Sequence, residues 1–381
     1  MLLNCRPLDA KRHIAIFASW YPTREQGLNG NFIQDFAHLL GTRYQVSVIH
    51  VGAQDGTQNP LVRVSCEGSV RVYQAELPHK KGISGFLFYQ VHWWKQIRKF
   101  WKQMCSEEGT PDIIQVQVVW KMGIAAVWYA WRAKIPFIVH EHWTGYYPAD
   151  PQLKGLRWLW HHLILRRAKA VSAVSKPLAL ALEALGARKP VAVLMNAVTY
   201  TAARADRSKF PHFLHVSNFR EEHKQTHSVL MVFQKVQKEF PEARLTLVGN
   251  APEDLRRAYT TAPGVAFSGP LTRQELGKLY AEATAVVSFS RFETFALSIA
   301  EGLLHGTPAI YTACGGPETY MQPHWGLRAD ADDPHTLYLC MHEFCSGSKN
   351  WNHAQIAAEA QQKFSQKALL DTFDSWLNRL I

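Results

Sequence analysis

The 381-residue chain lacks several features that mark specialised classes of protein. No run approaches the roughly 18–20 consecutive apolar residues of a membrane-spanning helix. The six cysteines form no C-x-x-C pair and no zinc-ligand spacing, so we interpret them as reduced, buried thiols. The segment before Lys11 is too short and too polar for a secretory signal. Together these absences predict a cytoplasmic protein.

Two further absences narrow the function. No G-x-G-x-x-G follows the first strand of either strand–helix series described below, which disfavours an NAD-dependent dehydrogenase. The chain also has no internal repeat of 20–50 residues, no low-complexity tract and no nucleic-acid-binding motif. We therefore expect no nucleic-acid partner.

Composition is that of an ordinary globular protein, with 47% hydrophobic and 19% charged residues. The length favours two domains over one.

The net charge of +11 is unevenly placed. Residues 1–200 hold 24 Lys and Arg against 12 Asp and Glu, whereas residues 201–381 hold 18 against 19. The first half therefore carries the basic character, which indicates an anionic surface or substrate there.

Short apolar strands alternate with amphipathic helices along the chain. The first series of expected strands lies at 13–19, 44–52, 70–77, 112–120, 136–142, 170–175 and 191–198. A second series lies at 212–219, 244–250, 265–269, 285–290 and 308–313. Alternation of this kind predicts two doubly wound α/β domains with parallel sheets. We expect domains at 1–203 and 204–362, divided in the polar stretch 199–210, and a final amphipathic helix at 363–381.

Two glutamates occupy a segment that otherwise reads as core, "SRFETFALSIAEGLLHGTPAI". Glu293 precedes an expected helix at 294–305, and Glu301 lies within it, about 80° around the axis. The first amides of such a helix lack intrahelical acceptors and form an anion site. A carboxylate that accepts two hydrogen bonds also suits a vicinal diol such as a ribose. The structural alternative is a helix cap at Glu293 and a paired core acid at Glu301.

The wider segment "SRFETFALSIAEGLLHGTPAIYTACGGPE" resembles the E-x7-E region of retaining glycosyltransferase family 4, whose members have the GT-B fold. Further stretches are similar to other parts of that family, and they cover nearly the whole chain. These stretches are "YPTREQGLNGNFIQDFAHLL", "AVSAVSKPL", "VLMNAV", "HVSNFREEHK", "LTLVGNAPE" and "GPLTRQELGKLYAEATAVVSFS". The resemblance implies two Rossmann-like domains whose parallel sheets face each other across a cleft. It also implies that the last helix packs back onto the first domain.

The resemblance assigns donor-binding roles around the glutamate pair. Glu301 is expected to hold the ribose hydroxyls of the donor, and Glu293 to contact its sugar. The amides expected to meet the diphosphate are those of Phe295, Ala296 and Leu297. Many relatives have glycine where this chain has Ala296.

Two cations are expected at the diphosphate. In "NFREEHK", at the end of the second domain's first strand, the resemblance places Arg220 and Lys224 against it. Cations placed in advance stabilise the negative charge that develops on the leaving group. This mechanism needs no metal and no cofactor beyond the nucleoside-diphosphate sugar. The alternative for both residues is a solvated loop.

In the first domain, "FIVHEHWTGYYP" places His140 and His142 on one face of a strand and Glu141 on the other. An H-x-H pair can ligate a metal, although no third ligand is evident. The resemblance instead places His142 near the reacting sugar, where it would steady developing charge. Gly27 and Gly30 follow the first strand and either allow close approach of a ligand or form only a turn.

The expected reaction is transfer of a sugar from a nucleoside diphosphate to an acceptor hydroxyl, with retained anomeric configuration. We expect a lipid-linked or glycan acceptor in bacterial surface-polysaccharide assembly, at the inner face of the cytoplasmic membrane. Two alternatives stay open. A sugar-nucleotide epimerase of related fold would need no acceptor, and a non-catalytic nucleotide- or glycan-binding protein would release no diphosphate.

A basic aromatic segment, "FLFYQVHWWKQIRKFWKQM" at 86–104, interleaves tryptophans with lysines and an arginine. A second such segment is "GLRWLWHHLILRR" at 155–167. Basic amphipathic helices that carry Trp lie in membrane interfaces. We therefore expect peripheral contact with an anionic membrane, and the alternative is two ordinary domain helices.

Overall fold

The computed structural model describes residues 11–23, 30–54, 59–79, 82–148, 152–198, 206–219 and 222–380. These residues form two compact units. The first unit contains the described residues up to Val174, then Ala179–Ala197, and the described residues from Leu370 onward. The second contains Ser175–Leu178 and the described residues of Val198–Leu369.

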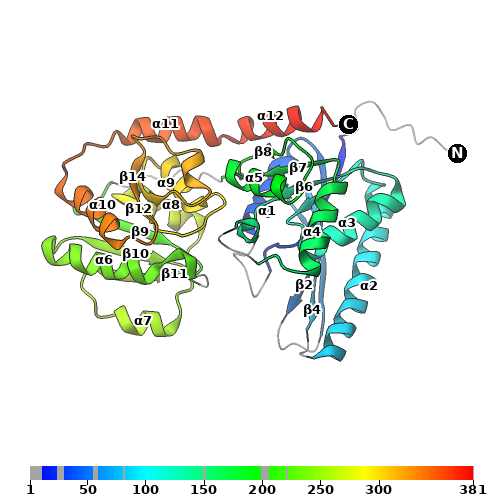
Figure 1. Cartoon of the computed structure of the whole chain (residues 1–381), viewed down its shortest axis with the longest axis horizontal. Helices are drawn as coiled ribbons and strands as arrows, with labels where there is room; N and C mark the ends of the chain where they lie inside the picture. The colour runs from blue at the N-terminus through cyan, green and yellow to red at the C-terminus, as the bar shows by residue number, and fades with distance from the viewer. Residues whose placement is uncertain are drawn as a thin grey trace. The chain divides into compact units, whose positions relative to one another are not determined.

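The first unit is built on an eight-stranded sheet of order β3-β4-β2-β1-β5-β6-β7-β8 (Figure 1). Its strands are β1 (His13–Ala18), β2 (Gln45–Gln54), β3 (Leu61–Glu67), β4 (Val70–Pro78), β5 (Ile113–Gln117), β6 (Phe137–Glu141), β7 (Ala170–Ala173) and β8 (Ala192–Val193). All neighbouring strands are parallel except β3 and β4. The chain reverses its direction of travel across the sheet between β1 and β5, as in a doubly wound fold.

Strand β3 corrects the expectation of a purely parallel sheet. It pairs antiparallel with β4 from Leu61 opposite Glu76 to Glu67 opposite Val70. Gly68, in the left-handed region at φ 61°, lies in the turn between them. Most side chains of β3 are exposed or half-buried, because β3 is the edge strand. An edge strand lacks the continuous apolar run of a buried parallel strand, which is why the pattern did not predict it.

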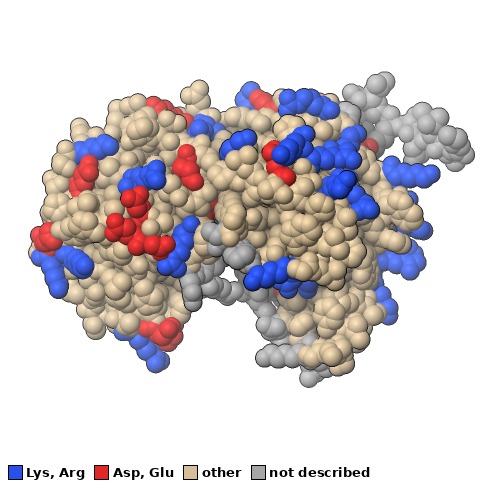
Figure 2. Space-filling view, in the orientation of Figure 1, with Lys and Arg blue, Asp and Glu red and all other residues tan. Residues whose placement is uncertain are grey.

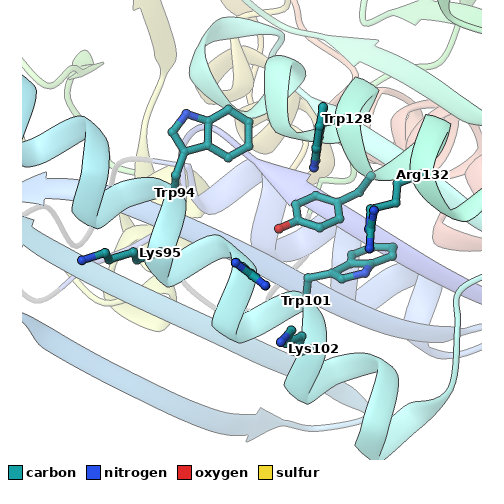
Figure 3. A pocket seen from close by; sticks show the side chains of 8 residues that line it. Trp94, Lys95, Trp101, Lys102, Trp128 and Arg132 are labelled. Atoms are coloured by element: carbon teal, nitrogen blue, oxygen red, sulfur yellow. The ribbon is translucent and has the colours of Figure 1, made fainter.

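The helices of the first unit connect its strands. They are α1 (Asn31–Gly41), α2 (Ile83–Glu108), α3 (Trp120–Ala133), α4 (Leu156–Arg167) and α5 (Lys176–Ala184). The strand expected at 112–120 is shorter than predicted, because β5 ends at Gln117 and α3 begins three residues later. Right-handed crossovers place α2 and α3 on the same face of the sheet. A cavity of about 780 Å³ lies between these two helices (Figure 3).

The end of the chain belongs to the first unit and packs against α1 and the start of β2. Helix α12 spans Gln366–Leu377. On it, Phe373 contacts the rings of Phe36 and Tyr44 edge-on, with centroids 5.7 and 5.8 Å away. The carboxylate of Asp374 accepts hydrogen bonds from the Tyr44 hydroxyl and the Arg43 guanidinium. Both apolar and polar contacts therefore hold this helix in place.

The second unit has a six-stranded, wholly parallel sheet of order β11-β10-β9-β12-β13-β14 (Figure 1). Its strands are β9 (His212–Val216), β10 (Arg244–Val248), β11 (Val265–Gly269), β12 (Ala285–Ser288), β13 (Ala309–Thr312) and β14 (Gly326–Ala329). Its helices are α6 (Thr226–Glu239), α7 (Glu253–Tyr259), α8 (Arg273–Glu282), α9 (Leu297–Leu304), α10 (Pro334–Ser346) and α11 (His353–Phe364). Both units are doubly wound, which confirms the predicted fold class.

One core of the second unit lies between its sheet and helices α6 and α10. Phe213, Leu245 and Val287 of the sheet are fully or almost fully buried against Phe233 of α6 and Met341 of α10. The apolar residues of α6 recur with helical spacing, which turns one stripe of the helix toward this sheet. This packing holds β9 and β12 side by side, and the candidate site described below is built on their ends.

Surface charge differs between the two units. In Figure 2, Lys and Arg side chains gather over the first unit with few acids, whereas the second unit shows both signs. The picture agrees with the uneven charge of the sequence. Within the described part of the chain, no helix has the length and apolar character needed to cross a membrane.

Candidate functional site

The predicted donor residues cluster at the point where the second sheet changes direction. The chain passes from β9 through β10 to β11, then returns to place β12 on the other side of β9. Lys224 follows β9, and Glu293 follows β12. Ligands of open α/β sheets bind at the carboxyl ends of the strands at such a switch point. Both side chains therefore stand where this fold offers a binding site.

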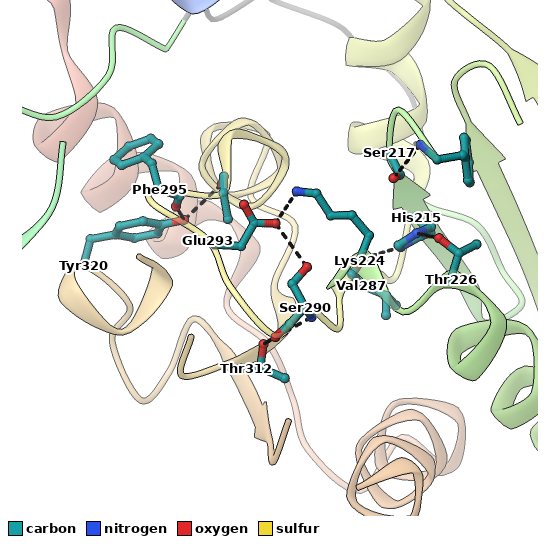
Figure 4. Close-up of polar contacts among 12 residues, drawn as sticks. His215, Ser217, Lys224, Thr226, Val287, Ser290, Glu293, Phe295, Thr312 and Tyr320 are labelled. Carbon is teal, nitrogen blue, oxygen red and sulfur yellow. Dashed lines mark hydrogen bonds and ion pairs between the residues drawn. The ribbon is translucent and has the colours of Figure 1, made fainter. Parts of the chain in front are cut away.

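Lys224 and Glu293 form an ion pair (Figure 4). The Lys224 ammonium donates to Oε1 of Glu293, and the Ser290 hydroxyl donates to the same oxygen at 3.1 Å. The Lys224 side chain is 21% exposed and that of Glu293 11%, so the pair is shielded but reachable. The backbone N–H of Glu293 also donates to the carbonyl of Cys314 at 3.0 Å. The structure thus brings two predicted site residues together.

The helix after Glu293 begins later than predicted. The expected helix was 294–305, but α9 spans Leu297–Leu304. Ala296 caps it with φ 64°, a left-handed conformation that interrupts the helical backbone before Leu297. Phe295 and Ala296 therefore belong to a loop, and of the three predicted amides only that of Leu297 lies in the helix. The 80° relation between the two glutamates also fails, because Glu293 is outside the helix.

Tyr320 shapes this loop, and the sequence analysis did not single it out. Its hydroxyl lies 2.8 Å from the Phe295 carbonyl and 3.1 Å from the Ala296 carbonyl, and it can donate to either (Figure 4). The Tyr320 side chain is buried, and its ring lies 5.1 Å from that of Phe295. Because the two carbonyls turn toward Tyr320, this contact orients the peptide groups of the loop. A tyrosine 25 residues away in sequence carries no local signal of this role.

Glu301 lies on α9 and is half-buried. Its Oε2 accepts a hydrogen bond of 2.8 Å from the hydroxyl of Tyr280 on α8. Burial, together with the negative charge of Glu301, holds the pKa of Tyr280 well above its usual range, so the tyrosine remains a donor. This contact fixes the side chain of Glu301 from one side.

Gly249 follows β10 beside the β9 end of the same sheet. Its φ of 129° lies in the region that favours glycine. A Cβ at this position would lie 1.9 Å from the Ser217 carbonyl oxygen, so no other residue fits without backbone movement. Backbone packing therefore requires glycine at this position of the "LTLVGN" stretch, independently of any ligand.

His215, on β9, supports the loop that carries Lys224. Its Nδ1 donates to the Val287 carbonyl at 3.0 Å, and its Nε2 accepts from the Thr226 hydroxyl at 3.1 Å (Figure 4). Burial lowers the pKa of His215 to about 4, and the nearby Lys224 ammonium acts in the same direction. The imidazole is therefore neutral at pH 7 and serves as a fixed bridge between β9, β12 and α6.

Acidification is expected to destabilise the fold partly through His215. In the unfolded chain the imidazole binds a proton as the pH falls below 6.5, whereas in the folded protein it binds one only near pH 4. The free energy of unfolding therefore decreases as the pH falls from 6.5 to 4. Between pH 7 and 5 this one group should cost about 2 kcal/mol. Urea unfolding of wild type and His215→Gln at both pH values should show a smaller loss in the variant. The exposed His227 is the matched control. If His227→Gln reduced the loss of stability between pH 7 and 5 as much as His215→Gln does, the role given to His215 would be wrong.

In the first unit, His142 follows β6 and is buried beside His140. The two rings lie 4.5 Å apart, which agrees with their predicted placement on one face. His142 Nε2 donates to Oε1 of Gln117 at 2.8 Å, and His140 Nδ1 donates to the Ser172 hydroxyl at 3.0 Å. Burial, and then the neighbouring His140, hold the pKa of His142 well below its usual range. His142 is therefore a neutral imidazole.

Glu141, which the alternation placed on the opposite face of the strand, is a buried and paired acid. Its carboxylate accepts from the backbone N–H of Val119 at 2.7 Å and from that of His142 at 2.8 Å. The Tyr146 hydroxyl donates to it at 2.7 Å and lies 2.8 Å from Nδ1 of His161. Burial raises the pKa of Glu141. This network ties the loop after β6 to β5 and α4, which sets the position of His142.

Gly30 precedes α1 with φ 84°. A Cβ there would lie 2.6 Å from the backbone nitrogen of Tyr21, so close packing of two backbone segments requires this glycine. Two other predicted residues, Gly27 and Arg220, lie outside the described residues. Among the residues that the structure does describe, no three His, Cys, Asp or Glu side chains are grouped so as to hold a metal ion. The H-x-H pair thus gains no third ligand there.

Comparison with protein families divides the chain much as the fold does. Residues 29–197 match the family described as "Glycosyl transferase 4-like domain". Residues 210–345 match the family described as "Glycosyl transferases group 1". Apart from Ser175–Leu178, the first match falls in the first unit, and the second match falls in the second unit.

One curated relative is the D-inositol 3-phosphate glycosyltransferase of a Nocardioides species, which is 36% identical over 97 residues. That match covers 25% of this chain and only 21% of the relative. Among solved structures, a sucrose-phosphate synthase from Thermosynechococcus elongatus has a TM-score of 0.75 at 17% identity, covering 97% of this chain and 99% of that one. HepE from Anabaena, in complex with UDP and glucose, has a TM-score of 0.72 at 18% identity, covering 97% and 100%. At these identities the two structures establish the fold alone.

Proposed function

Because the chain belongs to the group 1 glycosyltransferases, enzymes of the GT-B type that use nucleotide sugars, we propose that it transfers a sugar with retention of anomeric configuration. The donor is a nucleoside-diphosphate sugar, and the acceptor is a hydroxyl of a lipid-linked or glycan molecule. One observation carries the proposal. The Lys224–Glu293 pair stands at the switch point of the second sheet, directly before the helix that bears Glu301.

Each residue of this cluster has a task in the proposed reaction. Cleavage of the sugar–phosphate bond leaves negative charge on the departing diphosphate. The Lys224 ammonium and the first amides of α9 face that charge, and Arg220 joins them in the proposal. Glu293 fixes the ammonium and contacts the donor sugar, while Glu301 accepts hydrogen bonds from the ribose hydroxyls. We propose that these groups act without a metal ion.

His142 is proposed to stand near the reacting sugar. As a neutral imidazole held by Gln117, it offers a polar group of defined orientation. It would steady positive charge on the sugar ring as the bond breaks, and it would not act as a nucleophile. Gly30 is proposed to contact the donor through its backbone, because the space that a Cβ would need is taken by the Tyr21 backbone.

The acceptor and its setting rest on the first unit. Its basic, aromatic helices α2 and α4 favour peripheral contact with an anionic membrane. We propose that the protein works at the inner face of the cytoplasmic membrane in assembly of a bacterial surface polysaccharide. The complex of HepE from Anabaena with UDP and glucose supports testing UDP first as the donor nucleotide.

The first experiment is a thermal-shift series with UDP, GDP, ADP and CMP. We expect one diphosphate at millimolar concentration to raise Tm by mass action, because it binds only the folded protein. The corresponding sugar nucleotides are then tested for diphosphate release with and without acceptor extracts. Binding without diphosphate release in the presence of any acceptor would favour a binding protein. Conversion of the sugar nucleotide alone into an epimer would favour an epimerase.

The stereochemistry and the metal requirement are tested on the same reaction. Proton NMR of the first-formed product should show the anomeric configuration of the donor, and an inverted product would contradict the proposed mechanism. Activity should be unchanged by a chelator such as EDTA. A loss that Mg²⁺ or Mn²⁺ restores would contradict metal independence.

A further inference from the structure

The cavity between α2 and α3 combines two kinds of side chain. Aromatic residues form much of its wall, namely Trp94, Trp101, Trp128 and Tyr129 (Figure 3). All four charged residues of the described lining are cations, namely Lys95, Arg98, Lys102 and Arg132. At about 780 Å³ the cavity is of the size that holds small-molecule ligands. We refer to it as the α2–α3 pocket.

The floor of the pocket is rigid. Trp101 and Tyr129 stack with ring centroids 4.6 Å apart, and each ring lies about 6 Å from the buried Phe17 of β1. These two aromatic residues therefore belong partly to the core of the first unit. By contrast, Trp128 is 49% exposed, and Lys95, Arg98 and Lys102 are exposed along α2. The pocket thus has a packed aromatic base and an exposed cationic rim.

The surrounding charge favours an anionic ligand. Helix α2 contains four Lys and Arg residues and two Glu, α3 contains two and none, and α4 three and none. The two acids of α2, Glu107 and Glu108, lie at its last two positions and face β4. Glu107 pairs with Arg71 at 2.8 Å, and Glu108 accepts from the Tyr73 hydroxyl at 2.7 Å. Positive charge at the pocket therefore lacks a local carboxylate to neutralise it within the described lining.

Exposed apolar side chains lie on the same two helices, and one of them, Trp131, lies beside a lining residue of the pocket. On α2, Phe86, Leu87 and Phe88 are each more than half exposed. On α3, Trp131 is 71% exposed and lies 5.6 Å, ring to ring, from Trp128. A soluble phosphate gains nothing from such residues outside the pocket. A glycan can stack on the aromatic rings but leaves an aliphatic side chain such as Leu87 exposed, whereas a bilayer covers both kinds. Tryptophans beside Lys and Arg are typical of the membrane–water interface.

We propose that the α2–α3 pocket binds the phosphate headgroup of an anionic membrane lipid while the flanking aromatic side chains enter the interface. Arg98 and Lys102, one turn apart on α2, reach the phosphate. Trp128 and Trp131 lie beside the lipid glycerol and upper acyl chains. This assignment gives the membrane contact of the proposed function a defined site. It rests on that contact and is independent of sugar transfer.

The test is cosedimentation of the full chain with vesicles, without donor nucleotide. Neutral phosphatidylcholine vesicles are compared with vesicles that contain phosphatidylglycerol, for wild type and for Arg98→Gln/Lys102→Gln. We expect wild type to prefer the anionic vesicles. Removing two cations should weaken that binding about 30-fold. The matched control is Lys235→Gln/Lys238→Gln, which removes two exposed cations of α6 in the second unit, outside the pocket.

Each other outcome overturns a defined part of the proposal. Equal weakening by the pocket and control variants would mean diffuse surface attraction and no pocket. Absence of vesicle binding by wild type would remove the membrane contact altogether. If millimolar glycerol phosphate or inorganic phosphate binds without vesicles, and raises the Tm of wild type but not that of the pocket variant, the pocket takes a soluble phosphate. Preferential binding of an acidic oligosaccharide would assign it to a glycan. Thermal stabilisation by nucleotide, measured on the same samples, reports separately on the donor site and on folding.

Discussion

Replacing Lys224 by glutamine is expected to lower kcat by about 10²–10³ with little change in the affinity for the acceptor. The ammonium stands at the switch point of the second sheet, where the diphosphate would gather charge as the sugar leaves. A neutral amide of similar length keeps the packing but loses the charge. The measurement is initial-rate kinetics with saturating donor, once the donor nucleotide is known.

Two further variants separate this effect from a loss of stability. Lys224→Gln leaves the shielded Glu293 carboxylate without its cation, which by itself destabilises the fold. The double variant Lys224→Gln/Glu293→Gln also removes the carboxylate charge, so its Tm should recover while the rate stays low. Lys235→Gln, an exposed lysine of α6, should behave as wild type. Recovery of the rate in the double variant would contradict a direct role for Lys224.

Replacing Glu301 by glutamine is expected to weaken binding of the donor diphosphate about 100-fold. A carboxylate that accepts from both ribose hydroxyls forms two charge-assisted hydrogen bonds, each typically worth about 1.5–3 kcal/mol. Glutamine keeps one acceptor oxygen, places an N–H₂ group against a hydroxyl and has no charge. Isothermal titration with the nucleotide found in the thermal-shift series measures the difference.

Chemical and structural controls test the ribose role of Glu301 directly. Wild type should bind the 2′-deoxynucleoside diphosphate more weakly than the ribonucleotide, whereas Glu301→Gln should barely distinguish them. Tyr280→Phe removes the 2.8 Å hydrogen bond to Glu301 and keeps the carboxylate, so binding should fall far less. If wild type binds the ribonucleotide and the 2′-deoxynucleotide with equal affinity, Glu301 is a paired core acid and does not bind the ribose hydroxyls.

The pattern of the sequence predicted much of this fold because its signals are local. Buried parallel strands read as continuous apolar runs, and every expected strand overlaps an observed one. The edge strands β3 and β14 had no such run and were not predicted. The helix after Glu293 was predicted to begin three residues early, because nothing in "TFALS" announces the left-handed backbone of Ala296.

The residues of the candidate site also fall into those that the sequence indicated and those that it did not. The sequence indicated Glu293, Glu301, Lys224 and His142 as residues of interest, through their types and their resemblance to a family pattern. It did not indicate Ser290, Tyr280 or Tyr320, which hold those residues and their loop in place. These residues matter because the fold places their hydroxyl groups within hydrogen-bonding distance. Tyrosine and serine are so common that a sequence pattern does not single them out.

The sequence by itself therefore determined the alternation of strands and helices, the two-domain plan and the identity of the charged residues. Only the tertiary structure decided which of them meet. Lys224 and Glu293 are 69 residues apart, and they pair because β9 and β12 are neighbours in a sheet whose order is set by packing of the whole unit. Likewise, the α2–α3 pocket exists because two crossovers of the same hand place both helices on one face. Contacts of this range depend on the closed fold, and a local pattern does not encode them.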